Sequence, residues 1–254
     1  MEGRLKDKVI VVAGAGGIGD ELARRYAEEG AAVVLGDIEG DRAIAVAEGI
    51  AAMGASCIGT HLDGGADESI RAAIDLAVRR FGGLDGFHAN YAGFNGNDSL
   101  NDVTTIPMED FDEVMRVGSR GFVLCTRHAI PEMLKRGGGS IVYTSSDAAF
   151  MGEVVRVAYA MSKVSMHALA RHVARRFGPQ GIRANVICPG VVSHPRFEAA
   201  MPAEVAEEFA STTLVGRLGR PGDIAAMAAL MMSDEGSYIT GQVISVNGGS
   251  LMRA

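Results

Sequence analysis

The chain has 254 residues, of which 48% are hydrophobic and 22% are charged, a composition typical of a globular protein with a substantial core. Its 24 basic and 31 acidic residues give a net charge of −7, which argues against nucleic acid as a partner because phosphate binding needs a basic face. The N-terminus has no apolar signal core, and no run reaches the ~18 apolar residues of a membrane span. The three cysteines are scattered without metal-ligand spacing, so we expect buried thiols in a reducing cytoplasm and no metal site.

The first motif along the chain is a glycine-rich turn between a strand and a helix. Residues 8–13 are short, apolar and β-branched, as in a buried parallel strand, and residues 20–29 follow a helical pattern. Between them stands Gly14-Ala15-Gly16-Gly17-Ile18-Gly19, whose glycines allow a tight turn and the approach of a pyrophosphate to the backbone. Because a helix N-terminus adds N–H groups and a partial positive charge, we expect this segment to bind the phosphates of a dinucleotide.

An acidic residue follows the second predicted strand. Residues 31–36 are again apolar, and Asp37 lies 18 residues beyond Gly19, next to Ile38. A carboxylate at this place accepts hydrogen bonds from the 2′,3′-diol of a ribose and repels a 2′-phosphate. The nearest basic residue after it is Arg42. The motif therefore favours NAD over NADP, with Asp37 and Ile38 in the cofactor site.

Apolar segments alternate with helical stretches along the whole chain, which predicts a single domain over residues 1–254. The expected fold is α/β, a Rossmann-like doubly wound sheet of seven parallel strands with helices on both faces. The predicted strands are 8–13, 31–36, 56–62, 84–89, 139–145, 183–188 and 242–246, and the predicted helices are 20–29, 41–53, 68–81, 109–136, 158–177 and 221–232. Ligands of such sheets bind beyond the carboxyl ends of the strands, so the motifs at those ends should meet in one crevice.

Tyr159 and Lys163 form the motif with the clearest chemistry. They are four residues apart, so they share one face of the helix predicted over residues 158–177. A phenol has a pKa near ~10 and is a poor base at neutral pH, but a cation held close favours the phenolate. Ser146, 13 residues before Tyr159, follows a strand and could hold a substrate oxygen beside the phenol. A tyrosine four residues before a lysine on a helix is usually only a half-buried aromatic side chain beside a solvated charge. The dinucleotide motif elsewhere in the chain is what favours a site for carbonyl–alcohol chemistry.

Together these motifs resemble those of the short-chain dehydrogenase/reductase family over essentially the whole chain. The family's Tyr-x-x-x-Lys corresponds to Tyr159 and Lys163, and its catalytic serine corresponds to Ser146. The other corresponding residues are Asp63 with Gly64 after the third strand, Asn90-Tyr91-Ala92-Gly93 after the fourth, Pro189-Gly190 with Val192 and His194 in the nicotinamide-contacting segment, and Asn247-Gly248-Gly249 near the end.

The resemblance implies an NAD-dependent enzyme that acts on a small-molecule alcohol or ketone. Tyr159 would be the acid–base, Lys163 would lower the pKa of Tyr159 and bind the nicotinamide ribose, and Ser146 would orient the substrate oxygen. Asp63 would contact the adenine. The resemblance also implies a homotetramer or a homodimer, with the helices predicted over residues 109–136 and 158–177 paired across an interface.

The chain departs from the family pattern at four places. The glycine loop is one residue shorter, with Ala13 where threonine is usual, and we expect dinucleotide binding to survive with a shifted pyrophosphate. Gly118 stands where the family has a catalytic asparagine, so the proton relay is weakened, rerouted through a backbone carbonyl or Ser119, or maintained by another group or water. Tyr91 replaces an asparagine, more as a packing residue than as a substrate contact. His194 replaces a threonine that binds the carboxamide, and it either takes over that contact, touches substrate or faces solvent.

Residues 193–215 would form a lid over the substrate. One side of this segment is made apolar by four side chains, Phe197, Met201, Phe209 and Leu214. They favour an apolar or aromatic alcohol, although their helical spacing is also typical of core residues. Arg156 and Arg196 either pair with a substrate carboxylate or are surface charges.

Two other functions compete with the dehydrogenase. The first is a catalytically weak or inactive NAD(H)-binding sensor or scaffold, which Gly118 and His194 favour weakly. A sensor has no need of Ser146, Tyr159 and Lys163 together, which argues against it. The second keeps the fold but changes the reaction to epimerisation or dehydration, in which there is no net consumption of cofactor.

Overall fold

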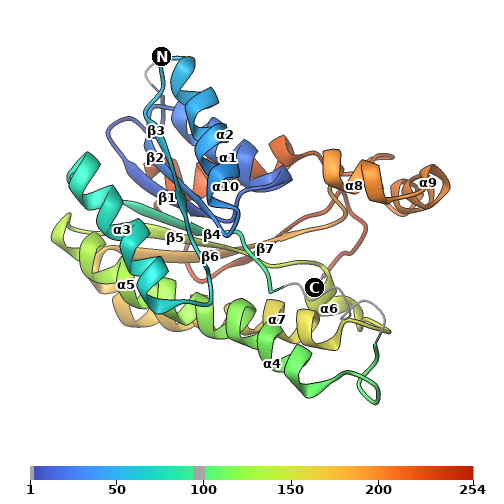
Figure 1. Ribbon diagram of the computed structural model, residues 1–254. Helices are drawn as coiled ribbons and strands as arrows, with labels where there is room; N and C mark the ends of the chain where they lie inside the picture. Colours follow the sequence, from blue (N-terminus) through green and yellow to red (C-terminus); the bar gives the residue numbers. More distant parts are fainter. Residues whose placement is uncertain (1–2, 94–100, 254) are drawn as a thin grey trace.

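Seven parallel strands form the centre of the molecule (Figure 1), for which the computed structural model describes residues 3–93 and 101–253. They lie in the order β3-β2-β1-β4-β5-β6-β7, which confirms the predicted doubly wound α/β fold. The strands are β1 (Val9–Ala13), β2 (Ala32–Asp37), β3 (Cys57–His61), β4 (Gly86–Ala89), β5 (Gly139–Thr144), β6 (Ile182–Pro189) and β7 (Val243–Val246).

Both faces of the sheet are buried, because the side chains of each strand alternate between two apolar cores. In β1, Val9, Val11 and Ala13 belong to one core, and Ile10 and Val12 belong to the other. Helices α3, α5 and α7 cover the first face, and α1, α2 and α10 cover the second (Figure 1). Their bounds are α1 (Gly17–Glu28), α2 (Gly40–Ala52), α3 (Asp67–Phe81), α5 (Gly121–Lys135), α7 (Val157–Phe177) and α10 (Pro221–Met232).

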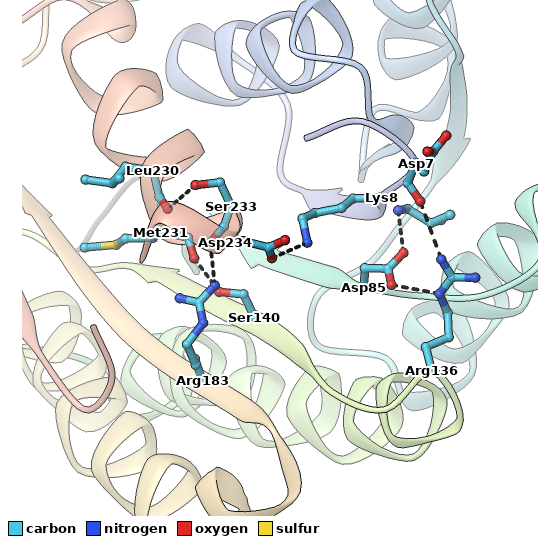
Figure 2. Close-up of polar contacts among 11 residues, drawn as sticks. Asp7, Lys8, Asp85, Arg136, Ser140, Arg183, Leu230, Met231, Ser233 and Asp234 are labelled. Carbon is cyan, nitrogen blue, oxygen red and sulfur yellow. Dashed lines mark hydrogen bonds and ion pairs between the residues drawn. The ribbon is translucent and has the colours of Figure 1, made fainter. Parts of the chain in front are cut away.

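Ion pairs close the end of the sheet at which the strands begin (Figure 2). Asp85 accepts a hydrogen bond from the Val9 backbone N–H at 2.8 Å and pairs with Arg136 at 2.7 Å. Lys8 pairs with Asp234 beyond α10 at 2.8 Å. These contacts tie the strands to the helices on both faces, while the predicted ligand-binding motifs lie at the opposite, carboxyl end.

The strand order reverses between β1 and β4, and this places two of the predicted motifs side by side. Ala13 at the end of β1 is paired with Ala89 at the end of β4. Gly14 and Asn90 are the next residues of the two strands, so the glycine turn and the Asn-Tyr-Ala-Gly segment start together. In open α/β sheets this switch point is where ligands bind.

The helix predicted over residues 109–136 is present but is not regular. It consists of α4 (Met108–Met115), a π-helical turn at Arg116–Arg120 and α5. Gly118 is buried in the π-helical turn, where an added Cβ would lie 2.8 Å from Ser162 Oγ and 2.9 Å from Ser162 Cβ. The irregular turn therefore lies where Ser162 of α7 approaches Gly118 closely. The periodicity of apolar residues along the sequence does not predict such a contact between helices.

Three short helices were not predicted: α6 (Ala148–Met151), α8 (Pro195–Ala200) and α9 (Ala203–Ser211). Helices α8 and α9 project from the carboxyl end of the sheet (Figure 1), and neither has a buried residue, so their apolar side chains do not form a stripe that packs on the core. Within the described ranges, no helix is long and apolar enough to cross a bilayer.

We expect Gly118→Ala to destabilise the protein, although alanine is the better helix former. The added Cβ would collide with Ser162, and overpacking of this kind costs about 1–3 kcal/mol. The gain of alanine over glycine within a helix is only about 1 kcal/mol. Gly49→Ala in α2 is the matched control. A Cβ there meets nothing within 4 Å, so this substitution should raise the free energy of unfolding. Urea unfolding of the two variants measures both signs, and equal gains would show that α7 does not press on Gly118.

Candidate active site

A cavity of about 360 Å³ opens at the carboxyl ends of the central strands. It brings together the glycine turn, the Asn90 segment, the end of β5, the Tyr159–Lys163 pair and the segment after β6. The residues that line it are Ala15, Gly16, Gly17, Ile18, Asn90, Ala92, Thr144, Ser145, Ser146, Tyr159, Lys163, Pro189, Gly190, Val192, His194 and Arg196.

Lys163 lies at the bottom of this cavity with only 3% of its surface exposed. Its ammonium donates hydrogen bonds to the backbone carbonyl of Tyr91 at 3.2 Å and to that of Thr144 at 2.9 Å. Burial disfavours the charged form and lowers the pKa of Lys163 from 10.5 to about 8. The two carbonyls supply the hydrogen bonds that a buried ammonium needs.

Tyr159 lies beside this ammonium, and Ser146 lines the same cavity. The ring centre of Tyr159, one helical turn before Lys163, is 5.6 Å from Nζ. Ser146 follows β5 directly, and its Oγ accepts a hydrogen bond from the Ala148 backbone N–H at 3.2 Å. The neighbouring Ser145 donates to the Lys163 carbonyl at 2.9 Å, which ties the end of β5 to α7. The structure thus places the three residues predicted for catalysis in one cavity.

Gly118 contributes no side chain to the site, and α7 closes the space beside it. Ser162, whose Oγ donates to the Tyr159 carbonyl at 2.7 Å, occupies the room that a side chain at residue 118 would need. Ser119 faces a separate surface hollow with Glu109 and Asp112. In the described part of the chain, the Lys163 ammonium donates hydrogen bonds to two backbone carbonyls, which favours a relay through a carbonyl over one through Ser119.

The glycine turn packs so closely against neighbouring backbone that residues 14 and 19 have no room for a side chain. Gly14 has a φ of 98°, and a Cβ there would lie 2.8 Å from the Tyr91 nitrogen, so only glycine fits. A Cβ at Gly19 would lie 1.9 Å from the Gly14 carbonyl oxygen. The side chain of Asn90 donates to the same oxygen at 3.0 Å. These contacts tie the start of α1 to the end of β4 and leave the first turn of α1 on the cavity.

Asp37 ends β2 at the rim of the site. Its carboxylate accepts hydrogen bonds from the backbone N–H groups of Ala15 at 2.7 Å and Glu39 at 2.9 Å. The acid is therefore held beside the glycine turn, as the predicted dinucleotide motif requires, but it does not line the cavity. Ile38 is 62% exposed and also lies outside the lining.

The other predicted cofactor residues outside the lining lie behind or beside the cavity. Asp63 follows β3, and its carboxylate accepts a hydrogen bond from the Gly65 N–H at 2.8 Å. A Cβ at Gly64 would lie 2.5 Å from the Tyr91 ring, and one at Gly93 would lie 2.8 Å from the backbone of α4. The pKa of the Tyr91 phenol is raised well above its usual value by burial, and the ring stacks on Phe122 with centres 5.0 Å apart, so Tyr91 is a packing residue.

His194 begins α8 and is not simply turned to solvent. Its Nδ1 accepts a hydrogen bond from the Phe197 backbone N–H at 3.3 Å, which caps the helix. Its ring lies so close to Gly17 that a Cβ at residue 17 would be 2.5 Å from the ring carbon Cγ. Partial burial lowers the pKa of His194, so the neutral ring is favoured against the glycine turn.

Arg196 was expected either to pair with a substrate carboxylate or to be a surface charge, and its contact with the cofactor side of the site was not predicted. It lines the cavity from α8 and pairs with Glu39, just beyond Asp37, at 2.6 Å. The spacing of charges along the chain could not have shown this, because the partners are far apart in the sequence. Thr144 was also not predicted as a lining residue, although its place at a strand end was a usable signal.

Comparisons with known proteins find relatives that match nearly the whole chain. A family model described as Enoyl-(Acyl carrier protein) reductase matches residues 12–250. A short-chain type dehydrogenase/reductase of Bradyrhizobium diazoefficiens is 36% identical over 98% of this chain and 89% of that protein. The (+)-cis,trans-nepetalactol synthase of Nepeta racemosa is 36% identical over 99% and 94% of the two chains, and the 7alpha-hydroxysteroid dehydrogenase of Escherichia coli K12 is 32% identical over 98% and 96%.

The fold and the site define an oxidoreductase of the doubly wound α/β class, whose relatives use nicotinamide cofactors. The matches extend over nearly the whole chain at identities that show common descent. The chain belongs to the short-chain dehydrogenase/reductase family.

We expect the parent protein to gain stability relative to Lys163→Met as the pH rises above about 8. Because the pKa of Lys163 falls from 10.5 to about 8 on folding, the unfolded chain binds more protons between these two values. The free energy of unfolding then rises with pH across that window, whereas below it the folded parent carries a buried charge. Urea unfolding of both proteins at a series of pH values measures the difference, and a constant difference would mean that Lys163 titrates normally.

Proposed function

We propose that the protein interconverts a secondary alcohol and a ketone by hydride transfer to and from NAD(H), with Tyr159 as the acid–base. The observation that carries this proposal is the place of the Tyr159 ring, 5.6 Å from a buried ammonium and in the same cavity as the glycine turn. The dehydrogenase names of two relatives support an alcohol as the substrate class.

The residues at the carboxyl end of the sheet fit a dinucleotide. Gly16 has a φ of 94°, and a Cβ there would meet nothing nearer than Arg42 Nη1 at 3.8 Å, so this backbone is open to a pyrophosphate. Gly17 and Ile18 begin α1, whose N-terminal dipole favours a phosphate. The nicotinamide end would lie along the opposite wall of the cavity, formed by Pro189, Gly190 and Val192.

The chain's own residues supply the proton chemistry. In alcohol oxidation, Tyr159 as phenolate takes the hydroxyl proton, and the Lys163 ammonium stabilises the phenolate charge. Ser146 donates a hydrogen bond to the substrate oxygen and holds it beside the phenol. The carbinol carbon would lose its hydride to NAD, which would supply the redox chemistry when bound. In ketone reduction, Tyr159 returns its proton to the substrate oxygen.

The substrate would lie under residues 193–215, which include α8 and α9. Phe209 is 38% exposed and Leu214 is 74% exposed, so the apolar side of this segment is not core. An exposed apolar lid favours an apolar alcohol or ketone.

Three more exposed apolar side chains on α5 and α7, Val123, Met161 and Val164, favour a homotetramer or homodimer formed through these helices.

Gly118 is the observation that favours the alternative, a weak or inactive NAD(H)-binding sensor. It removes the asparagine that the family uses, and Ser162 closes the space. The enzyme is the better interpretation because Ser146, Tyr159 and Lys163 all line the cavity. One relative is named as a synthase and not as a dehydrogenase, so an assay should follow the product as well as NADH.

We expect Tyr159→Phe to abolish most turnover while NADH binding is nearly unchanged. The variant keeps the ring and removes only the group that transfers the proton, whose loss costs about 10²–10⁴-fold in rate. Turnover is measured on a panel of secondary alcohols and ketones by NADH absorbance, and binding by NADH fluorescence. A variant that retains turnover within about tenfold of the parent would contradict the assignment. Tight NADH binding by the parent with no turnover on any compound would favour the sensor.

We expect Asp37→Ser to weaken NADH binding and to strengthen NADPH binding by about tenfold or more, since the variant removes the charge that repels a 2′-phosphate. Serine can still accept a hydrogen bond, so the Ala15 and Glu39 contacts are not wholly lost. Titration of both proteins with both cofactors gives the ratio of dissociation constants. The preference of the parent for NADH is the control, and an unchanged ratio would show that another group selects the cofactor.

A further inference from the structure

A second cation lies beside the Tyr159 phenol. The guanidinium carbon of Arg156 is 5.4 Å from the ring centre of Tyr159, and Lys163 Nζ is 5.6 Å from the same point. Arg156 immediately precedes α7 and pairs with Glu153 at 2.9 Å. The ring that carries the reacting phenol thus has two positive charges near it, one of which has its own carboxylate partner.

The backbone of Arg156 is held in an unusual conformation. Its φ is 60°, and among the described residues Asp7 is the only other non-glycine residue with a positive φ. The Arg156 N–H donates to the Asn101 carbonyl at 3.3 Å, and its carbonyl accepts the Ala160 N–H at 3.0 Å. A left-handed conformation at a residue with a Cβ is strained and persists only where the surroundings enforce it. Here the strained turn places Arg156 against the first turn of α7, and so against Tyr159.

The two cations differ in their contact with solvent. Lys163 is 3% exposed, whereas the Arg156 side chain is 33% exposed and that of Glu153 is 18% exposed. The field of Lys163 on the phenol is therefore strong and insensitive to salt, and the field of Arg156 is weaker, screened by ions and partly cancelled by Glu153.

We propose that Arg156 is a positioning residue that stabilises the ionised phenol of Tyr159, and that Glu153 moderates this effect by pairing with the guanidinium. The inference rests on the proposed function in so far as the ionised phenol is the base of the reaction. It goes beyond that function by giving the acid–base group a second, adjustable charge in addition to the lysine.

Other ionisable groups also act on this part of α7. The described elements packed against it carry Asp110 on α4, Asp147 before α6, Cys188 on β6 and Arg253 over the Phe150 ring at 3.8 Å. His167 lies further along α7 and contacts Ser145 at 2.9 Å. None of these groups is altered by substitutions at residues 153 and 156, so their contributions cancel in a comparison of such variants.

The experiment compares four proteins: the parent, Arg156→Gln, Arg156→Lys and Glu153→Gln. Glu153→Gln keeps the side-chain length and removes a negative charge. Arg156→Gln shortens the side chain and removes a positive charge, and Arg156→Lys keeps that positive charge. The first measurement is an ultraviolet difference titration of tyrosinate, with the same protein carrying Tyr159→Phe as the blank, so that only Tyr159 is seen. The second measurement is the pH profile of kcat/KM for alcohol oxidation.

We expect the ionisation midpoint of Tyr159 to move up in Arg156→Gln and down in Glu153→Gln, each by about half a pH unit, and to stay in place in Arg156→Lys. The pH profile of kcat/KM should move in the same directions, and both displacements should shrink at high salt. Displacements in the same direction, or none in either glutamine variant while circular dichroism shows native structure, would overturn the proposal.

The difference titration separates this proposal from the proposed function. If no alcohol is oxidised by the parent but the midpoints move in opposite directions, Arg156 acts on Tyr159 and the proposed reaction is at fault. If the parent oxidises an alcohol and Tyr159→Phe does not, but the midpoints coincide, the reaction stands and the role of Arg156 is wrong. A glutamine variant that does not fold is replaced by the other, since either one predicts a displacement of stated sign.

Discussion

The two hydrogen bonds from the buried Lys163 ammonium to backbone carbonyls set the geometry of the site. The acceptors, Tyr91 after β4 and Thr144 at the end of β5, belong to neighbouring strands. A buried charge without hydrogen bonds is costly, so α7 is stable only where Nζ reaches both oxygens. That requirement also places Tyr159, one helical turn before Lys163, near the end of β5. Ser146 follows this strand.

Close backbone approach is the second constraint on this end of the sheet. A Cβ at Gly121 would lie 2.1 Å from the Gly64 carbonyl oxygen, and one at Gly118 would lie 2.8 Å from Ser162 Oγ. The helix that starts at α4 is therefore pressed against the loop after β3 on one side and against α7 on the other. The π-helical turn between α4 and α5 is the local adjustment that permits both contacts. Residue 118 serves packing here, and the space for an asparagine side chain is filled by the neighbouring helix.

The sequence predicted the parts of this structure that depend on burial and on local turns. Strands such as β1 are apolar on both faces, and Gly14 needs a positive φ, so both leave a local mark. Helices α8 and α9 bury no residue, so the helical spacing of their apolar side chains did not define them as elements packed on the core. The π-helical turn, the pairing of Arg196 with Glu39 and the strained backbone of Arg156 arise from contacts between segments distant in the chain or from forced local geometry. For the same reason, Ser146, Tyr159 and Lys163 could be named from their spacing, but the carbonyls that hold Lys163 could not.

The contrast between Lys163 and Arg156 follows from where each charge meets water. A cation acts most strongly on a phenol when both are shielded from solvent, but its burial then costs stability, and the lowered pKa of Lys163 is the sign of that cost. A partly exposed guanidinium costs little and contributes less, and its carboxylate partner reduces that contribution further. While it is protonated, the buried lysine would therefore supply the larger part of the field on Tyr159, and salt would change that part little. The arginine and Glu153 together would supply a smaller part, which salt can change without loss of the fold.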